Sequence, residues 1–224
     1  MVTGDHLLTG LDVWPRLAEL VTGAGRVGRS PAYLAIACIG STADQWLPLR
    51  PGDILVCGAT DASVRLGLTS TAVLRRWHDS GAHVFSRPGL HAKSGVVGAR
   101  AFIGSANASR RSVENRDEAT LVTTDRRLVA ELRTFVGELL RPPALELGVL
   151  ELDRLAALPV RAPKWPEQPA RPPLFPAAGR ILLFDGVDAR PAQAGRPGQP
   201  AAVPARPVAA AGTPAPDGHH AGAA

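Results

Sequence analysis

Apolar residues recur at helical spacing in three segments of the chain, and we predict a helix in each of them. The predicted helices cover residues 11–21, 69–79 and 124–140. Ser or Thr can cap the second helix and Thr or Asp the third, while Gly81 and Pro142 follow their ends. Because glycine and proline interrupt helices, these boundaries agree with the apolar pattern.

Continuous apolar runs of strand length separate the first two helices, at residues 32–39 and 53–57. Such runs are typical of strands that are buried on both faces of a sheet. Four shorter strands are predicted at residues 82–86, 93–97, 101–104 and 119–123, the middle two forming a hairpin around Gly98. Strands that alternate with helices predict an α/β layered domain.

The composition changes near residue 160. Thirteen of the 21 prolines lie after residue 162, and the last part of the chain is rich in Ala, Pro and Gly. A segment with so few apolar side chains cannot offset its ordering entropy by burial. We therefore predict one domain at residues 1–160 and a disordered tail at 161–224. The apolar segment 180–184 could form a stray hairpin, a docking peptide or a partner-binding motif.

Charge and cysteine content narrow the class of protein. The net charge is +5, with 23 Arg against 2 Lys, which permits a nucleic acid partner without requiring one. Cys38 and Cys57 lie in apolar runs without CxxC spacing, so they indicate neither a zinc site nor a disulfide framework. With no apolar run of about 18 residues and no secretory signal pattern, we expect a soluble cytoplasmic protein without a membrane span.

The sequence from Gly23 to Gly28 reads GAGRVG and matches the glycine pattern of dinucleotide-binding proteins. That site needs a strand before the glycines and a helix after them, because the pyrophosphate lies at the helix N-terminus. Here a predicted helix precedes the glycines and a proline-led strand follows. We interpret the segment as a turn.

His91 and Lys93 lie two residues apart at the start of a predicted strand. Side chains at this spacing share one face, so the imidazole and the ammonium lie side by side. Burial and the like charge keep the imidazole neutral, and a neutral ring nitrogen can attack phosphorus. Taken alone, this pair is more often a partly exposed strand edge.

Gly104-Ser105-Ala106-Asn107 follows the next apolar run. The Ser105 hydroxyl and the Asn107 amide are neutral donors, suited to phosphate oxygens and to the charge of a pentavalent transition state. Glycine at 104 allows a close backbone approach. Taken alone, the segment is an ordinary turn with a helix cap.

Together, HAK, ten further residues and GSAN resemble the signature of the phospholipase D superfamily. The resemblance implies a mixed sheet flanked by helices and a phosphodiesterase that needs no metal or other cofactor. It also implies that His91 is a nucleophile that forms a phosphohistidine, that Lys93 and Asn107 bind phosphoryl oxygens, and that Ser105 assists them.

The chain departs from the family pattern at two points. Gly98 stands where the family has an Asp, and the spacer before Gly104 is one residue short. Glu118 resembles the downstream acid that orients the nucleophilic His in single-signature nucleases of this superfamily. A surface Glu is the alternative interpretation.

The chain has one H-x-K motif, although the family reaction uses one His to attack and another to protonate the leaving oxygen. The resemblance therefore implies a homodimer with a site shared across a two-fold axis. Arg110 and Arg111 follow the GSAN segment and could hold phosphates that flank the reacting group, as could Arg87 and Arg100. Solvated surface arginines are the alternative.

Our first hypothesis is a dimeric, nuclease-like phosphodiesterase that hydrolyses DNA or RNA. A phospholipase D that acts on phospholipid is a second possibility. A third is a non-catalytic nucleic-acid-binding or regulatory module, for which Gly98 would be a sign of lost activity. The sequence does not rank these substrates, because specificity depends on predicted loops at residues 44–46 and 61–68.

Overall fold

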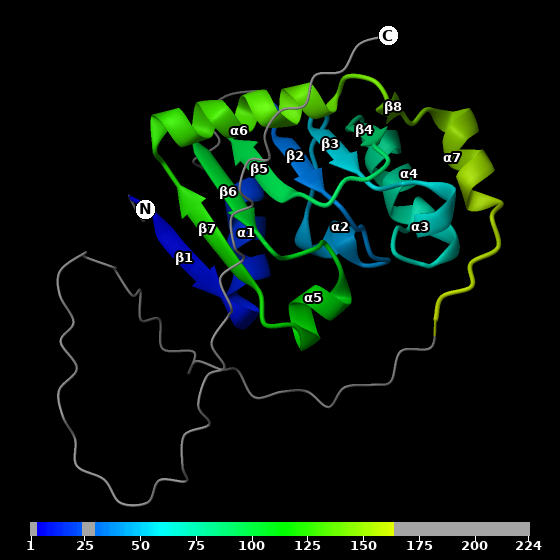
Figure 1. The fold of residues 1–224 in the computed structure, drawn as a ribbon, viewed down its shortest axis with the longest axis horizontal. Helices are drawn as coiled ribbons and strands as arrows, with labels where there is room; N and C mark the ends of the chain where they lie inside the picture. The colour runs from blue at the N-terminus through cyan, green and yellow to red at the C-terminus, as the bar shows by residue number, and fades with distance from the viewer. Residues whose placement is uncertain (1–3, 24–29, 164–224) are drawn as a thin grey trace, which may run out of the picture. The chain divides into compact units, whose positions relative to one another are not determined.

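A computed structural model describes residues 4–23 and 30–163. Their core is an eight-stranded sheet with the order β1-β7-β6-β5-β2-β3-β4-β8 (Figure 1). The strands are β1 (His6–Thr9), β2 (Tyr33–Ile36), β3 (Ile54–Cys57), β4 (His83–Ser86), β5 (Lys93–Val97), β6 (Arg100–Gly104), β7 (Ala119–Thr123) and β8 (Leu145–Glu146). In this sheet β2, β3 and β4 run parallel, and the other neighbours pair antiparallel. The predicted α/β fold with a mixed sheet is confirmed.

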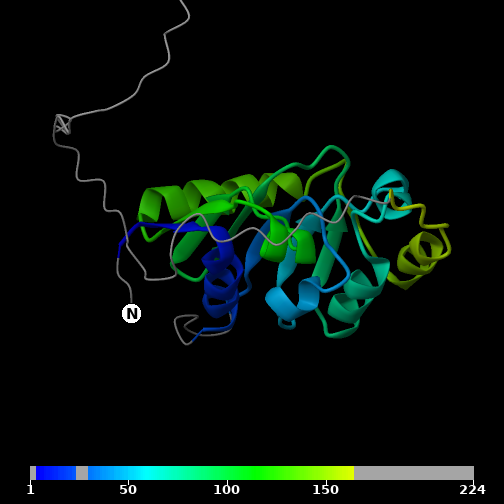
Figure 2. The ribbon, with the colours of Figure 1, turned by 90° about the horizontal axis from the view of Figure 1, so that it is seen from below.

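Helices flank both faces of the sheet. They are a 3-10 turn (Gly10–Asp12), α1 (Val13–Thr22), α2 (Ala43–Trp46), α3 (Asp61–Arg65), α4 (Thr71–Asp79), α5 (Arg110–Asn115), α6 (Arg126–Leu139) and α7 (Val149–Ala156). Helix α6 packs on β2, β5 and β6, where it buries Val129 and Val136. Helices α1, α2, α4 and α7 contribute to the main core on the opposite face (Figure 2).

Successive side chains of β2 point alternately into the main core and toward α6. Leu34 and Ile36 point into the main core, whereas Tyr33 and Ala35 meet α6. Because successive side chains of a strand point to opposite faces, a strand covered on both sides must be apolar throughout. This explains the continuous apolar run in the sequence.

The three helices and six strands expected from the sequence are all present, and the predicted bounds of β5 and β7 agree with the structure. The strand predicted at 32–39 is wrong at its end, because β2 stops at Ile36. Beyond it the backbone N–H of Cys38 donates to the Asn107 side chain, and Ile39 makes an isolated bridge to Ala108. The chain thus leaves the sheet to meet the GSAN segment.

The predictions missed the shortest elements. Strands β1 and β8 and helices α2, α3, α5 and α7 were not expected, and the segments 44–46 and 61–68, taken as loops, include α2 and α3. Gly23 follows the end of α1 as predicted. The remaining part of the GAGRVG segment and the predicted tail from residue 164 onward, with its 180–184 segment, lie outside the described residues.

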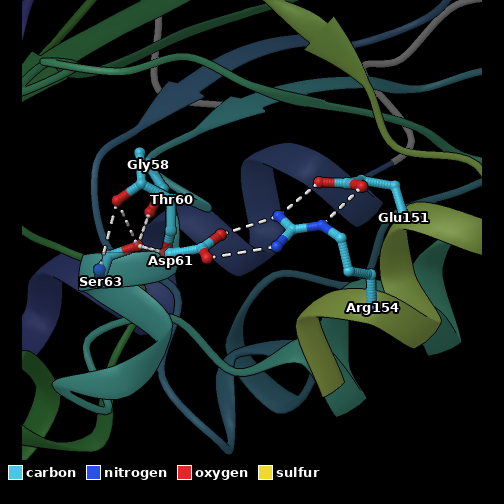
Figure 3. Close-up of polar contacts among 6 residues, drawn as sticks. All are labelled: Gly58, Thr60, Asp61, Ser63, Glu151 and Arg154. Carbon is cyan, nitrogen blue, oxygen red and sulfur yellow. Dashed lines mark hydrogen bonds and ion pairs between the residues drawn. The ribbon is translucent and has the colours of Figure 1, made fainter. Parts of the chain in front are cut away.

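The segment after β3 is fastened to helix α7 (Figure 3). Thr60 caps α3 by accepting the N–H of Ser63 at 3.2 Å. The Arg154 guanidinium lies between two carboxylates, at 2.7 Å from both Asp61 and Glu151. Hydrogen bonding from Arg154 lowers the pKa of each carboxyl group. Helix α7, missed in the sequence, therefore holds α3 in place.

Strand register brings the sequence motifs to one edge of the sheet. Ile36, at the end of β2, pairs with Lys93 at the start of β5. Ser94 pairs with Ile103, and Gly104 pairs with Thr120 near the start of β7. The end of β6 and the beginnings of β5 and β7 therefore meet, although they are separated in the sequence.

Gly104 lies in a close approach of β6 to β7. A Cβ atom at this position would overlap Thr120 Oγ1 and the carbonyl oxygen of Ala119. We expect Gly104→Ala to lower the free energy of unfolding by about 1–3 kcal/mol, because overpacking forces the two strands apart. Urea denaturation measures this change.

Gly137 in α6 provides the matched control. A Cβ atom there meets nothing within 4 Å. Gly137→Ala should raise the free energy of unfolding by about 0.4–1 kcal/mol, since alanine restricts the unfolded chain. Equal effects of the two substitutions would contradict the close approach at Gly104.

Candidate active site

His91 and Lys93 meet as the sequence predicts. Lys93 Nζ lies 3.2 Å from His91 Nε2 and donates to the His91 carbonyl oxygen at 2.8 Å. Lys93 is only 8% exposed, whereas His91 is exposed. The ammonium thus forms the base of the site, and the imidazole stands at its surface.

The environment of Lys93 disfavours its charge. Burial lowers the pKa of Lys93, while Cys38 and Glu118 act in the opposite direction. Cys38 is a neighbour that the sequence analysis did not assign to the site, and burial raises the pKa of its thiol.

Ser105 is held by Glu118. The Ser105 hydroxyl donates to Glu118 Oε2 and accepts the N–H of Ala119 at 3.1 Å. The other Glu118 oxygen accepts from the Ser112 hydroxyl on α5. In this structure Glu118 therefore positions a serine, and its orienting role on His91 stays a prediction.

Asn107 joins the GSAN segment to the end of β2. Its Oδ1 accepts the backbone N–H of Cys38 at 3.1 Å, and the N–H of Gly40 donates to Ala108 O at 2.7 Å. With Oδ1 engaged in this way, the amide N–H groups are what Asn107 offers to a phosphate oxygen. Ser109, two residues after Asn107, is the N-cap of α5.

A groove of about 400 Å³ collects the motif side chains, and we call it the catalytic groove. It is lined by His91, Ala92, Lys93, Ser94, Ile103, Gly104, Ser105 and Phe135. Three of the four predicted signature residues thus share one groove. The fourth, Asn107, contacts Cys38 beside it.

Residues 54–139 match the family model described as "Cardiolipin synthase, PLD-like domain". The match runs from β3 to the end of α6 and includes every side chain of the predicted catalytic set. This segment is therefore similar to a phospholipase D-like domain.

Three solved structures have low similarity to the chain. NucT from Helicobacter pylori is 18% identical with a TM-score of 0.45, over 61% of this chain and 94% of that one. The phospholipase D family member Nuc from Salmonella typhimurium is 11% identical with a TM-score of 0.47, over 64% and 98%. Phosphatidylserine synthase from Haemophilus influenzae Rd KW20 is 14% identical with a TM-score of 0.47, over 62% and 37%. No curated protein matches the sequence significantly.

Gly98, which replaces the superfamily's Asp, lies away from the catalytic groove. It begins the two-residue turn between β5 and β6 with a φ of +62°, a conformation that favours glycine. It is five residues beyond Lys93 along the sequence, about 16 Å along an extended strand. The missing carboxylate therefore removes no group from the groove, and the shortened spacer is taken up by the tight turn.

The arginines named from the sequence occupy different environments. Arg110 pairs with Glu114 at 2.9 Å within α5, and Arg111 is half-buried on the same helix. Arg87 donates to the carbonyl oxygens of Leu139 and Arg141 at 2.9 and 2.8 Å, so it caps the end of α6. Arg100 lies in a second groove, beyond α6.

Phe135 is a site residue that the sequence analysis missed. Its position in the apolar stripe of α6 predicted burial, but Phe135 is 42% exposed and lines the catalytic groove. Leu128 on the same stripe is also largely exposed. Helical spacing places these two residues on one face of α6, but neither is buried there.

Within residues 4–23 and 30–163, no group of three or more His, Cys, Asp or Glu side chains could hold a metal ion. No helix in those ranges is long and apolar enough to span a membrane.

The buried ammonium predicts a conflict between stability and function. Because the pKa of Lys93 is lower than in the unfolded chain, its charge costs folding free energy at neutral pH, and this cost falls as the pH rises through the lowered value. At pH 7 the Lys93→Met variant should therefore have a free energy of unfolding equal to that of the wild type or higher, by up to about 2 kcal/mol. Urea denaturation measures this change.

Lys93→Arg is the matched control, because it keeps the charge and should not stabilise the protein. A loss of more than about 2 kcal/mol in Lys93→Met would instead mean that the ammonium holds the fold together.

Proposed function

We propose that this protein is a metal-independent phosphodiesterase that works through a phosphohistidine intermediate and acts on nucleic acid. The observation that carries the proposal is the 3.2 Å approach of His91 Nε2 to Lys93 Nζ in a groove shared with Ser105. An exposed nucleophile above a buried cation suits attack on an anionic phosphodiester.

In the proposed first step the neutral His91 imidazole attacks phosphorus. A nitrogen–phosphorus bond forms while the bond from phosphorus to the leaving oxygen breaks. The Lys93 ammonium, the Ser105 hydroxyl and the Asn107 amide N–H groups stabilise the phosphoryl oxygens. Glu118 holds the Ser105 hydroxyl in position through its hydrogen bond.

The leaving oxygen needs a proton, and the resemblance assigns this task to a second histidine. We propose that His91 of the partner subunit, in its imidazolium form, donates that proton. In the second step it takes a proton from water, whose oxygen attacks phosphorus and releases His91. A homodimer with both histidines at one two-fold axis is part of this proposal.

Nucleic acid is the proposed substrate because of what surrounds the groove. Arg110 and Arg111 follow the GSAN segment and suit phosphates that flank the reacting one. Phe135 offers an aromatic surface on which a base can stack. Both cysteines are free thiols, which fits the proposed cytoplasmic location.

The activity is tested by His91→Ala on bis-p-nitrophenyl phosphate, single-stranded DNA, duplex DNA, RNA and phosphatidylcholine, all with EDTA present. We expect the wild type to hydrolyse the small diester and nucleic acid, and the substitution to lower kcat/KM at least about a thousandfold. Release of p-nitrophenol or labelled fragments measures the rate.

His83→Ala is the control, because His83 is exposed and bonds to Glu146 on β8 at 2.8 Å, outside the groove. It should keep wild-type activity. Hydrolysis that stops with EDTA would rule out the metal-independent mechanism, and a preference for phosphatidylcholine would replace nucleic acid by lipid.

The shared site is tested by mixing subunits. The wild type should sediment as a dimer, and its specific activity should fall on dilution below the dimer dissociation constant. Mixed dimers with one His91→Ala subunit should be nearly inactive, because each reaction needs both histidines. A fully active monomer would contradict the proposed dimer.

A further inference from the structure

A second groove, of about 470 Å³, lies on the other flank of α6. Three of its lining residues are Arg100, Arg126 and Arg133, and we call it the arginine groove. The remaining lining residues are Ala99, Thr124, Val129, Ala130 and Thr134. Phe135 of the catalytic groove is about 200° around the helix from Arg133, so α6 separates the two grooves.

The arginine groove is lined by no acidic residue. Several other arginines pair with carboxylates: Arg127 with Glu131, Arg110 with Glu114 and Arg141 with Glu138. Among the described residues no carboxylate pairs with Arg100, Arg126 or Arg133. Their charge is thus concentrated in one concave place and is available to an anion.

Arg133 is held in place before any ligand arrives. Its Nη2 donates to the Gly98 carbonyl oxygen at 3.1 Å, and its guanidinium carbon lies 5.2 Å from the centre of the Tyr33 ring. A side chain that is already ordered loses little entropy on binding. The turn at Gly98 therefore positions Arg133 in the arginine groove and takes no part in the catalytic groove.

Arg126 begins α6, where the N-terminal end of a 14-residue helix adds positive potential. Two acidic residues close to the start of α6 form hydrogen bonds within the fold. Asp125 caps α6 by accepting the N–H of Leu128 at 2.9 Å, and Asp5 accepts the Thr123 hydroxyl at 2.6 Å. Neither carboxylate lines the groove.

We propose that the arginine groove binds the phosphodiester backbone of single-stranded nucleic acid, as a second site remote from the reacting phosphate. This rests on the proposed nucleic acid substrate. Guanidinium groups match phosphate geometry, and a flexible single strand can follow a concave surface. A flat anionic membrane fits a discrete groove poorly, since surface-binding helices present an exposed apolar face with a basic rim.

The groove is tested by Arg100→Gln with Arg126→Gln in a His91→Ala background, which prevents cleavage. Fluorescence anisotropy with a labelled single-stranded oligonucleotide of about 20 bases measures affinity at several salt concentrations. The double substitution should weaken binding at least about tenfold at low salt. It should also reduce the slope of log K against log salt by about 1.4, since two phosphate contacts are lost.

Arg127→Gln is the matched control, because Arg127 neighbours Arg126 on the same helix but pairs with Glu131 at 2.8 Å. It should bind DNA as the parent does. Unchanged DNA affinity in the double variant, or an equal loss in Arg127→Gln, would overturn the proposal. Loss of binding to phosphatidylglycerol vesicles with unchanged DNA affinity would overturn it in favour of a lipid surface.

The small substrate separates this inference from the proposed function. With His91 intact, the double variant should hydrolyse bis-p-nitrophenyl phosphate at the wild-type rate, because that diester is too short to reach beyond α6. An equal loss on this substrate would overturn a remote site. If the wild type does not hydrolyse the diester, the proposed activity is wrong. The binding measurements would still test whether the arginine groove binds single-stranded nucleic acid.

Discussion

The pairing of β5 between β2 and β6 is the constraint on which the site depends. Ile36 pairs with Lys93 and Ser94 with Ile103, and this register places the His91–Lys93 pair beside the end of β6, which leads into the Ser105–Asn107 segment. A slip of one residue would turn Lys93 toward the opposite face of the sheet. Gly95 makes the register possible, because a Cβ atom there would overlap Leu34 and the Phe102 ring.

This register places a charge where the fold does not favour one. Lys93 is buried and its pKa is lowered by that burial, so the site stores a cost that the apolar cores on both faces of the sheet must offset. The same burial makes the ammonium effective toward a phosphoryl oxygen, since charges interact more strongly away from water. Stability and phosphate binding thus oppose each other at one side chain.

The sequence predicted the elements whose pattern is long or strict. The apolar run through β2 follows from burial on both faces, and the Ser105–Asn107 turn follows β6 at the expected edge. Helical spacing showed which residues share a face of α6, but not which of them are buried, so the place of Phe135 in the groove could not be predicted. Arg87 could not be assigned, because the carbonyl groups it caps lie more than fifty residues away in sequence.

Gly98 has a different meaning once its position is known. A missing carboxylate at this position would suggest that catalytic activity has been lost. Gly98, however, lies at the far end of β5 from Lys93. Its left-handed conformation closes a two-residue turn, and its carbonyl oxygen accepts from Arg133. An acidic side chain there would stand beside the arginines that line the second groove and would reduce their positive potential. The glycine therefore leaves the catalytic groove intact and keeps the opposite flank of α6 positive.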